Sequence, residues 1–462
     1  DGFARETTEK LANWNPYDQN ASADFFDPEW MFGIREGFDI VIGNPPYVRQ
    51  EAIKEFKPRL QAQGYECFNG IADLYVYFFE RGVKLLKRDG LLCYISSNSF
   101  LNSGFAEGLR SFLQQHTRLH LLIDFAETGV FTAITEPCII LVSRGGQPNE
   151  AVRLLKWNEN DPVDQVPVKA ATCFITLPQK EFRSDGWRLE SPAVLRLLEK
   201  LRAAGKPLGE YVNGRFYYGI KTGLNEAFVV DRATRDRLIA EHKSSAEVLK
   251  PFLRGRDIKR WRVEPQDLWL IFTRRGINIK KYPAIYEHLL PFKKRLMPGA
   301  PGGRKPGSYE WYEIQDNIAY WQEFEQPKIV YQDIARYFGM AWDDSGSYLA
   351  NTCYFIPRAA KWLLATLLSS AMQFYVRKVI GSDEGGFIRL FSIHVEKFPI
   401  PSPSRAEHDA LVKLVERILA AKRADAAADV SAWEREIDER VYRLYGLTPA
   451  EIKIVEEGGR KG

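Results

Sequence analysis

The clearest hydrophobic pattern lies early in the chain, where an apolar run stops at a glycine and two prolines. Residues 38–43 are short, β-branched and almost wholly apolar, and Asn44-Pro45-Pro46-Tyr47 comes directly after them. Such a run predicts a strand buried on both faces of a parallel sheet. The prolines end it because neither can donate a ladder hydrogen bond. Asn44 and Tyr47 are therefore expected at the carboxyl end of a strand, where open α/β sheets bind ligands.

The pattern after this strand alternates between helical and strand periods. Apolar side chains recur at helical spacing after Gly70, which predicts a helix that ends at Gly90 ahead of a strand at 91–96. The next expected elements are a helix at 104–115 and strands at 119–125 and 138–143. Together these elements predict the later half of a Rossmann-like α/β sheet.

The remaining patterns divide the chain into further parts, as its 462 residues lead us to expect. We predict a partial α/β domain, a connector, an α+β domain rich in short strands and aromatics, and a helical tail. A helix at 191–203 closes the connector, and another is expected at 359–376. The four parts are assigned to residues 1–146, 147–204, 205–402 and 403–462.

Charge and cysteine usage narrow the function classes. The net charge is only +4, yet residues 251–305 hold fourteen Lys/Arg against four Asp/Glu. A localised basic stretch favours a polyanion partner, with a solvated basic face as the alternative. The five cysteines are scattered without a C-x-x-C pair, so disulfides and a metal site are not expected. The sequence contains no apolar run of membrane-spanning length, and the expected setting is the cytoplasm.

The tetrapeptide Asn44-Pro45-Pro46-Tyr47 resembles the signature of the amino methyltransferases. These enzymes move a methyl group from S-adenosylmethionine to an exocyclic amine, usually adenine in DNA. The resemblance implies that the Asn44 side-chain oxygen and the Pro45 carbonyl bind the two amine hydrogens, which directs the nitrogen lone pair at the methyl group. Tyr47 would offer its ring to a base extruded from the duplex. The alternative is a strand that ends in a Pro-Pro turn.

The same resemblance suggests further site residues. Asp24 and Phe25 match an Asp-Phe pair near the cofactor, and Asp73 matches an acid that approaches the cofactor or substrate. Phe131 matches an aromatic that stacks on the base opposite Tyr47. Each has an alternative: a surface turn for Asp24-Phe25, a helix N-terminal acid for Asp73, and a core phenylalanine for Phe131.

One expected motif does not occur. In this class a Gly-rich cofactor loop precedes the catalytic motif, and residues 1–37 contain no G-x-G. The chain therefore resembles the later part of a longer polypeptide, with the main S-adenosylmethionine loop expected upstream.

The region from 205 to about 400 closely resembles the TaqI-like C-terminal specificity domain, which holds DNA in that family. The motifs that carry this likeness include Gly219-Ile220-Lys221-Thr222-Gly223-Leu224-Asn225, Arg254-Gly255-Arg256 and Phe398-Pro399-Ile400-Pro401. Lysine and arginine can neutralise phosphates, and Arg, Lys and Asn can contact base edges. The candidate DNA contacts are Lys221, Thr222, Asn225, Arg254, Arg256, Lys259, Arg260, Arg274, Arg275 and Arg389.

The sequence as a whole is similar to an adenine-specific DNA methyltransferase of the fused type II (type IIG) restriction-modification or phage-exclusion family. The implied partner is double-stranded DNA in a prokaryotic nucleoid, with other restriction or defence subunits as further candidates and no membrane. The alternatives are a non-catalytic DNA-binding fragment and a protein-glutamine methyltransferase. No convincing D…E-x-K cluster supports an endonuclease.

Overall fold

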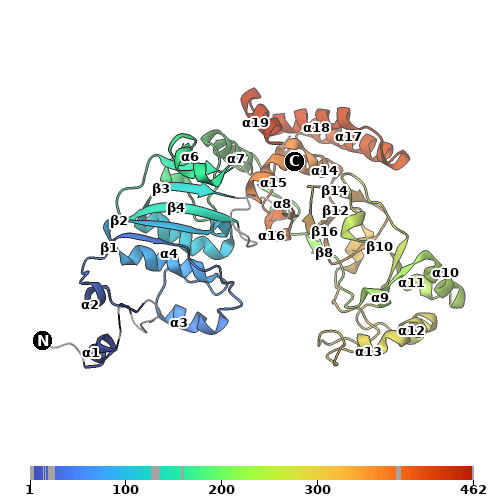
Figure 1. The fold of residues 1–462 in the computed structure, drawn as a ribbon. Helices are drawn as coiled ribbons and strands as arrows, with labels where there is room; N and C mark the ends of the chain where they lie inside the picture. Colours follow the sequence, from blue (N-terminus) through green and yellow to red (C-terminus); the bar gives the residue numbers. More distant parts are fainter. Residues whose placement is uncertain are drawn as a thin grey trace. The chain divides into compact units, whose positions relative to one another are not determined.

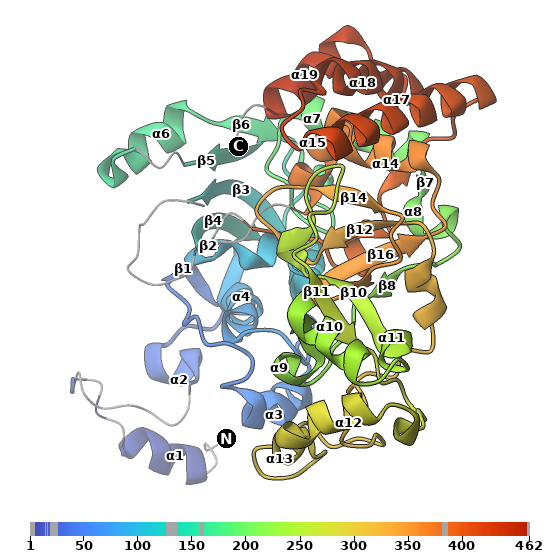
Figure 2. The same ribbon diagram turned by 90° about the vertical axis from the view of Figure 1, so that its right-hand side faces the viewer.

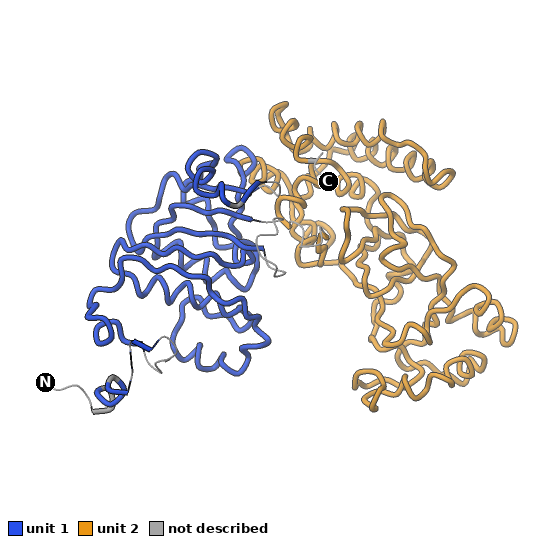
Figure 3. Tube along the Cα trace, in the orientation of Figure 1, with its two compact units in different colours: residues 1–195 blue, residues 196–462 orange. Residues whose placement is uncertain are grey.

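The computed structural model describes residues 5–13, 15, 17–18, 26–125, 136–157, 161–380 and 387–459. The chain forms two compact units, residues 1–195 and 196–462 (Figure 3). Within the described ranges, no helix combines the length and the apolar character needed to cross a membrane.

Unit 1 is built on a mixed sheet whose described strands lie in the order β1-β2-β4-β3-β5-β6 (Figure 1). Strand β1 pairs with β2 in parallel, whereas β4 runs antiparallel to both β2 and β3. The strands are β1 (Phe38–Gly43), β2 (Leu86–Ser97), β3 (Thr117–Asp124), β4 (Pro137–Arg144), β5 (Val152–Lys156) and β6 (Ile175–Leu177). The helices are α1 (Arg5–Ala12), α2 (Pro28–Phe32), α3 (Lys57–Ala62), α4 (Leu74–Leu85), α5 (Glu107–His116), α6 (Val166–Thr172) and α7 (Pro192–Ala204), which crosses into unit 2.

Helices α4 and α5 cover one face of this sheet, and α6 packs on part of the other. The larger core joins Phe79 of α4 and Phe112 of α5 to the strands. The smaller cluster pairs Phe125 with Trp157, against which Val166 of α6 packs. This arrangement results from the alternation of side chains along each strand, which sends neighbouring residues to opposite faces.

Strand β1 differs from its prediction. It lies at the edge of the described sheet, and Ile40 and Ile42 are 61% and 78% exposed. Val41 points to the other face and packs against the core below the sheet. The strand therefore packs against the core on one face only, and that face is partly buried. An apolar run shows that a strand can be buried but does not show which elements cover it.

The predicted helix ending at Gly90 is also shorter than expected. Helix α4 stops at Leu85, and β2 already begins at Leu86. Asp89 takes a left-handed φ of 62°, and a Cβ on Gly90 would lie 2.7 Å from the Phe38 carbonyl oxygen. Gly90 thus permits β1 to approach β2 closely and does not end a helix.

The segment predicted as a connector, 147–204, contributes to the sheet of unit 1. Strand β5 pairs in parallel with β3, and β6 pairs antiparallel with β5. The predicted helices at 104–115 and 191–203 correspond to α5 and α7, each with ends displaced by one to three residues. Short strands are expected in this segment from its sequence, but their place in the sheet depends on pairing with distant strands, which local patterns do not predict.

Unit 2 contains two small four-stranded sheets among its described residues, β15-β10-β11-β9 and β14-β12-β16-β8 (Figure 2). The strands are β7 (Lys206–Pro207), β8 (Tyr217–Tyr218), β9 (Val229–Asp231), β10 (Leu249–Leu253), β11 (Leu268–Ile271), β12 (Lys328–Gln332), β13 (Ile334–Ala335), β14 (Met340–Asp343), β15 (Tyr348–Leu349), β16 (Cys353–Pro357), β17 (Ile388–Arg389) and β18 (Pro399–Ile400). One apolar core joins the sheets and includes Phe252, Phe324 and Phe355.

The helices of unit 2 include a group that ends the chain. They are α8 (Leu208–Tyr211), α9 (Asn225–Phe228), α10 (Arg232–Glu241), α11 (Ser245–Val248), α12 (Pro283–Leu289), α13 (Lys293–Leu296), α14 (Lys361–Leu368), α15 (Ser370–Val379), α16 (Ser392–Val395), α17 (Arg405–Ala424), α18 (Ser431–Leu444) and α19 (Pro449–Gly459). Helix α14 packs on α17, and α15 packs on α19. The helix expected at 359–376 is divided at Ser369, whose side chain caps α15 by accepting from the Met372 N–H.

A buried ion pair joins two strands of unit 2. Lys328 of β12 and Asp343 of β14 face each other in register, with 2.7 Å between Nζ and Oδ2 and no exposure of either side chain. Lys328 also donates to the Phe324 carbonyl. Burial lowers the pKa of Lys328, and the neighbouring Asp343 carboxylate opposes this.

Replacing one member of this pair should destabilise unit 2 strongly. Lys328→Met leaves the Asp343 carboxylate buried without its cation, which typically costs about 3–5 kcal/mol. The double variant Lys328→Met/Asp343→Asn should recover most of this loss, because the introduced amide is neutral and its oxygen could still accept from the Ser345 N–H. Guanidinium unfolding of the three proteins measures the difference. Equal stability of the single and double variants would contradict this account.

Candidate functional site

The Asn44-Pro45-Pro46-Tyr47 segment leaves the sheet where β1 ends. Gly43 is the last residue of β1 and lies opposite Tyr94 of β2. A Cβ at Gly43 would lie 3.4 Å from the Tyr94 ring, which is ordinary van der Waals contact, so the ring of Tyr94 packs directly against the end of β1. Asn44 is exposed and Pro45 is buried. The Asn44 carboxamide is therefore presented at the carboxyl edge of a parallel strand pair.

The residues after the tetrapeptide are tied to the N-terminus of α4. The Val48 N–H donates to the Pro46 carbonyl at 2.9 Å, and the Leu74 N–H donates to the Val48 carbonyl at 3.0 Å. The Gln50 N–H donates to Asp73 Oδ1 at 2.8 Å. Burial raises the pKa of Asp73, and the Gln50 hydrogen bond opposes the rise. Asp73 thus anchors the candidate catalytic segment to α4.

Tyr47 is partly buried, and its hydroxyl oxygen is enclosed. No described residue hydrogen-bonds that hydroxyl. Burial, followed by the neighbouring Cys138, raises the pKa of Tyr47, so the phenol is neutral at physiological pH. The predicted stacking partner, Phe131, lies outside the described residues.

Sequence reasoning missed a polar group at the same edge of the sheet. Asn98 comes after β2 and donates through Nδ2 to Asp124 Oδ1 at 3.0 Å and to Glu136 Oε2 at 3.1 Å. Asp124 ends β3, and Glu136 precedes the antiparallel β4. Strands β1, β2 and β3 run in the same direction, so Asn44, Asn98 and Asp124 lie at the same ends. A polar residue directly after each apolar run was the available signal.

The structure describes the residues predicted to bind the amine, whereas two of the three predicted cofactor contacts lie outside the described residues. Asp24 and Phe25 lie outside the described residues. Asp73, the third predicted cofactor contact, already accepts from the Gln50 N–H through one carboxylate oxygen. Asn44 is the predicted site residue whose polar side chain is exposed at the strand end. The donor set described here therefore does not define an S-adenosylmethionine site.

The predicted DNA contacts fall into two groups in unit 2. The first group is exposed at the surface of the unit. Its members are Lys221, Asn225, Arg256, Lys259, Arg274 and Arg389, with the Arg274 guanidinium 5.3 Å from the Trp321 ring centroid. Thr222 is instead 1% exposed, and its hydroxyl donates to Asn225 Oδ1 at 2.7 Å.

Three arginines of the second group are engaged within the fold. Arg254 binds Asp257 through Nε and Nη2, both at 3.1 Å. Arg260 binds Glu434 Oε1 at 2.7 Å and the Leu368 carbonyl. Arg275 contacts the Glu313 carboxylate at 3.3 Å and the Gln315 carbonyl at 3.1 Å. The positive charges of these three arginines are thus partly neutralised by carboxylates within unit 2.

Known families match both units. The Eco57I restriction-modification methylase matches residues 3–131, and the TaqI-like C-terminal specificity domain matches residues 250–400. The type II methyltransferase M.BstVI of Geobacillus stearothermophilus is 23% identical over 475 residues, covering 96% of this chain and 80% of its own length. M.PaeR7I of Pseudomonas aeruginosa is 26% identical over 455 residues, with 93% and 74% covered.

A solved structure supports the same fold. The type IIL restriction-modification enzyme MmeI, solved in complex with DNA, superposes with a TM-score of 0.60 at 15% identity. The alignment covers 91% of this chain and 57% of the MmeI chain, so this chain spans little more than half of that enzyme. The chain is similar to the type II methyltransferases of restriction-modification systems, with the methylase match in unit 1 and the specificity-domain match in unit 2.

The enclosed Tyr47 hydroxyl leads to a prediction about the free energy of unfolding. Tyr47→Phe removes a buried polar group that no described residue satisfies, so the free energy of unfolding should stay unchanged or rise by about 1 kcal/mol. Tyr77→Phe is the matched control, because the Tyr77 hydroxyl donates to the Asn69 carbonyl at 2.9 Å and its loss should cost about 1 kcal/mol. Thermal unfolding of both variants tests this. A Tyr47→Phe loss as large as that of the control would mean that the hydroxyl has a partner.

Proposed function

We propose that this chain is the catalytic-strand and specificity portion of a DNA adenine-N6 methyltransferase. The observation that carries the proposal is the exposed Asn44 at the carboxyl end of β1, with the next segment tied to α4. The family matches support a DNA methyltransferase, and the choice of adenine N6 rests on the residue types of the tetrapeptide.

The proposed chemistry requires the amine nitrogen to present its lone pair. The lone pair of an aromatic amine is delocalised into the ring. The Asn44 side-chain oxygen and the Pro45 carbonyl accept one amine hydrogen each, which brings the nitrogen toward tetrahedral geometry. Holding both hydrogens also fixes the direction of attack, and such positioning can supply a large part of a rate enhancement.

Bound S-adenosylmethionine would supply a methyl group on a sulfonium centre. Transfer of that group to the amine nitrogen would replace the donor's C–S bond by a new N–C bond and would leave the bonding electron pair on sulfur. The methylated nitrogen then loses one of the protons that Asn44 and Pro45 hold. A neutral carboxamide is a poor base, so this proton passes to water. Tyr47 contacts the ring of the extruded base and keeps it against the strand end.

Unit 2 would hold the duplex in the proposed function. Its match to a specificity domain and the exposed cations Lys221, Arg256, Lys259 and Arg389 support this assignment. Phosphate contacts by such residues give binding that weakens as salt rises. A protein-glutamine substrate would leave this basic domain without a use.

The Asn44 side chain provides the direct test. In the intact protein that carries this chain, Asn44→Ala should lower methyl transfer to duplex DNA by roughly 100-fold or more, as loss of one positioned polar group does in other active sites. Duplex affinity should stay within about twofold. Asn102→Ala, which changes another exposed asparagine of unit 1, is the control.

The measurement is transfer of labelled methyl from S-adenosylmethionine, with nucleoside analysis of the digested DNA. Near-normal transfer by Asn44→Ala would refute the catalytic assignment. Methyl found on cytosine would refute the choice of adenine, and label found only on protein would favour the glutamine alternative. A wild-type protein that binds duplex but transfers no methyl would favour the non-catalytic alternative.

A further inference from the structure

The turn at residues 219–225 of unit 2 alternates between enclosed and exposed positions. Gly219, Ile220 and Thr222 are buried, whereas Lys221 and Asn225 are exposed. Buried residues therefore flank Lys221 on both sides in sequence. An exposed lysine on a surface loop usually samples many positions, so the contacts beneath this turn decide whether Lys221 is held.

The first residues of the turn pack against the backbone of residues 349–353. The Gly219 N–H donates to the Cys353 carbonyl at 2.8 Å, and the Ile220 N–H donates to the Leu349 carbonyl at 2.7 Å. A Cβ at Gly219 would lie 1.9 Å from the Ala350 carbonyl oxygen. Only glycine fits there, because the two backbones touch. The start of the turn is thus fixed to β15 and β16, which belong to the two different small sheets of unit 2.

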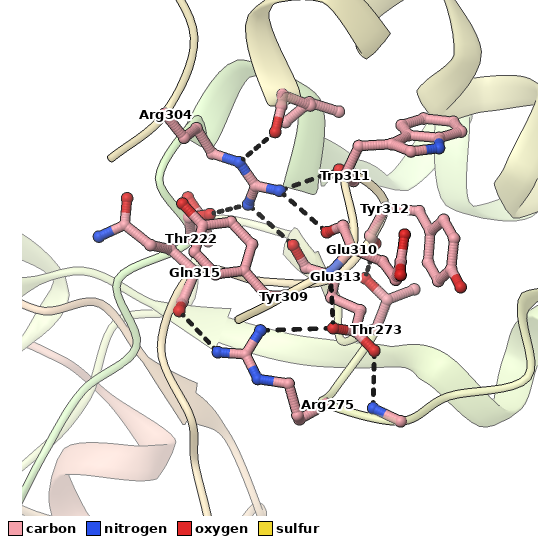
Figure 4. A network of polar contacts seen from close by, with 12 residues as sticks. Thr222, Thr273, Arg275, Arg304, Tyr309, Glu310, Trp311, Tyr312, Glu313 and Gln315 are labelled. Atoms are coloured by element: carbon pink, nitrogen blue, oxygen red, sulfur yellow. Dashed lines mark hydrogen bonds and ion pairs between the residues drawn. The ribbon is translucent and has the colours of Figure 1, made fainter. Parts of the chain in front are cut away.

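A buried arginine holds the middle of the turn. Arg304 is 5% exposed, and all five of its N–H groups are directed at backbone carbonyls (Figure 4). Nη1 donates to the Thr222 carbonyl at 2.9 Å, which joins the turn to the segment that carries Arg304. The other four acceptors are the carbonyls of Leu296, Glu310, Trp311 and Glu313.

The burial and contacts of the Arg304 guanidinium indicate that this side chain is held in one position. Burial lowers its pKa to about 10, and the Tyr309 ring centroid lies 4.7 Å from its guanidinium carbon. A buried cation whose donors are all satisfied is costly to displace, since moving it would leave charge and carbonyls without partners. Arg304 cannot itself reach a polyanion from this position.

A second contact holds Lys221 directly. The Lys221 N–H donates to Asp316 Oδ2 at 3.1 Å, and the Asp316 N–H donates back to the Lys221 carbonyl at 3.2 Å. The Gln315 N–H donates to the Thr222 carbonyl at 3.1 Å, and Arg275 holds the Gln315 carbonyl (Figure 4). Arg304 and Asp316 therefore bind the backbone of residues 221 and 222 directly, and Arg275 supports it through Gln315.

We propose that Arg304 and Asp316 are positioning residues that hold the 219–225 turn so that Lys221 contacts a phosphate of bound duplex DNA. The inference rests on the proposed DNA binding by unit 2 and adds to it. Asn225 lies beside this contact, and the Thr222 hydroxyl occupies its Oδ1, which leaves its amide N–H groups to donate. The Lys221 ammonium and the Asn225 amide would thus both offer donors to a phosphate.

Substitution of Asp316 provides a test, because its two possible effects change duplex affinity in opposite directions. Removing a carboxylate near DNA should tighten binding, whereas losing the Lys221 anchor should weaken it. Asp316→Asn removes the charge but keeps an oxygen that can accept from the Lys221 N–H, so its affinity should equal or exceed the wild-type value. Asp316→Ala removes the acceptor as well, and its affinity should fall by about 3- to 10-fold at 100 mM salt.

The binding probe is a fluorescent 30-base-pair duplex of mixed sequence, titrated by anisotropy between about 50 and 300 mM NaCl. Lys221→Met should weaken binding like Asp316→Ala and lower the salt slope by about 1. The double variant Lys221→Met/Asp316→Ala should bind no more weakly than Lys221→Met. Multiplied effects in the double variant would mean that Asp316 acts on stability in general and would overturn the proposal.

Two glycines test Arg304 separately. A Cβ at Gly223 (φ +85°) would lie 2.5 Å from Arg304 Cδ, whereas a Cβ at Gly302 (φ +71°) meets nothing within 4 Å. Both alanine variants carry the strain of a left-handed residue, and only Gly223→Ala should lose duplex affinity and salt slope. Thermal melting confirms that both are folded.

The outcomes separate the proposed function from the positioning roles. If wild-type protein shows no salt-dependent duplex binding, the proposed DNA-binding function fails and this inference fails with it. If wild-type protein binds while Asp316→Ala matches Asp316→Asn and Gly223→Ala matches Gly302→Ala, the proposed function stands and the positioning roles are wrong. If Gly223→Ala does not fold, the Asp316 pair alone decides.

Discussion

The parallel pairing of β1 with β2 is the constraint on which the candidate catalytic edge depends. Its register places Gly43 opposite Tyr94 and ends both strands at one edge of the sheet. Glycine makes the close approach possible at Gly90, where a Cβ would lie 2.7 Å from the Phe38 carbonyl oxygen of the partner strand. Once the strands are paired, the prolines direct the chain off the edge, and Asp73 holds the segment after them through the Gln50 N–H. The position of Asn44 is thus a consequence of backbone contacts spread over two strands and a helix.

Local pattern was enough to find the parts of this edge that are continuous in sequence. The apolar run before Asn44 predicted the strand, and helical spacing predicted α4, α5 and α7. Local pattern failed where a feature depended on distant partners. The exposure of Ile40 reflects which strands lie beside β1, and the placement of β5 in the sheet reflects pairing with β3. Neither the exposure of Ile40 nor the position of β5 can be predicted from the residues next to it in sequence.

The basic stretch shows the same distinction for charge. Fourteen Lys/Arg in residues 251–305 predicted a polyanion surface, and the fold uses several of them internally. Arg260 binds a glutamate on α18, and Arg304 is enclosed by carbonyls. A count of basic residues therefore overestimates the charge available to a ligand, because arginine's five donors also suit it to joining loops. Thr222 illustrates the converse, since a residue in the predicted contact loop turns out to support its neighbours.

The apolar edge of unit 1 has a practical consequence for the behaviour of this chain in solution. Ile40 and Ile42 lie exposed on an edge strand, where the intervening residue faces the core, and Asp39, paired with Lys87, is the adjacent charge. Exposed edge strands favour pairing with further strands, and hydrophobic association persists in salt that weakens phosphate contacts. Light scattering across the same salt range would therefore distinguish release of a polyanion, which salt promotes, from self-association of the protein, which salt leaves intact.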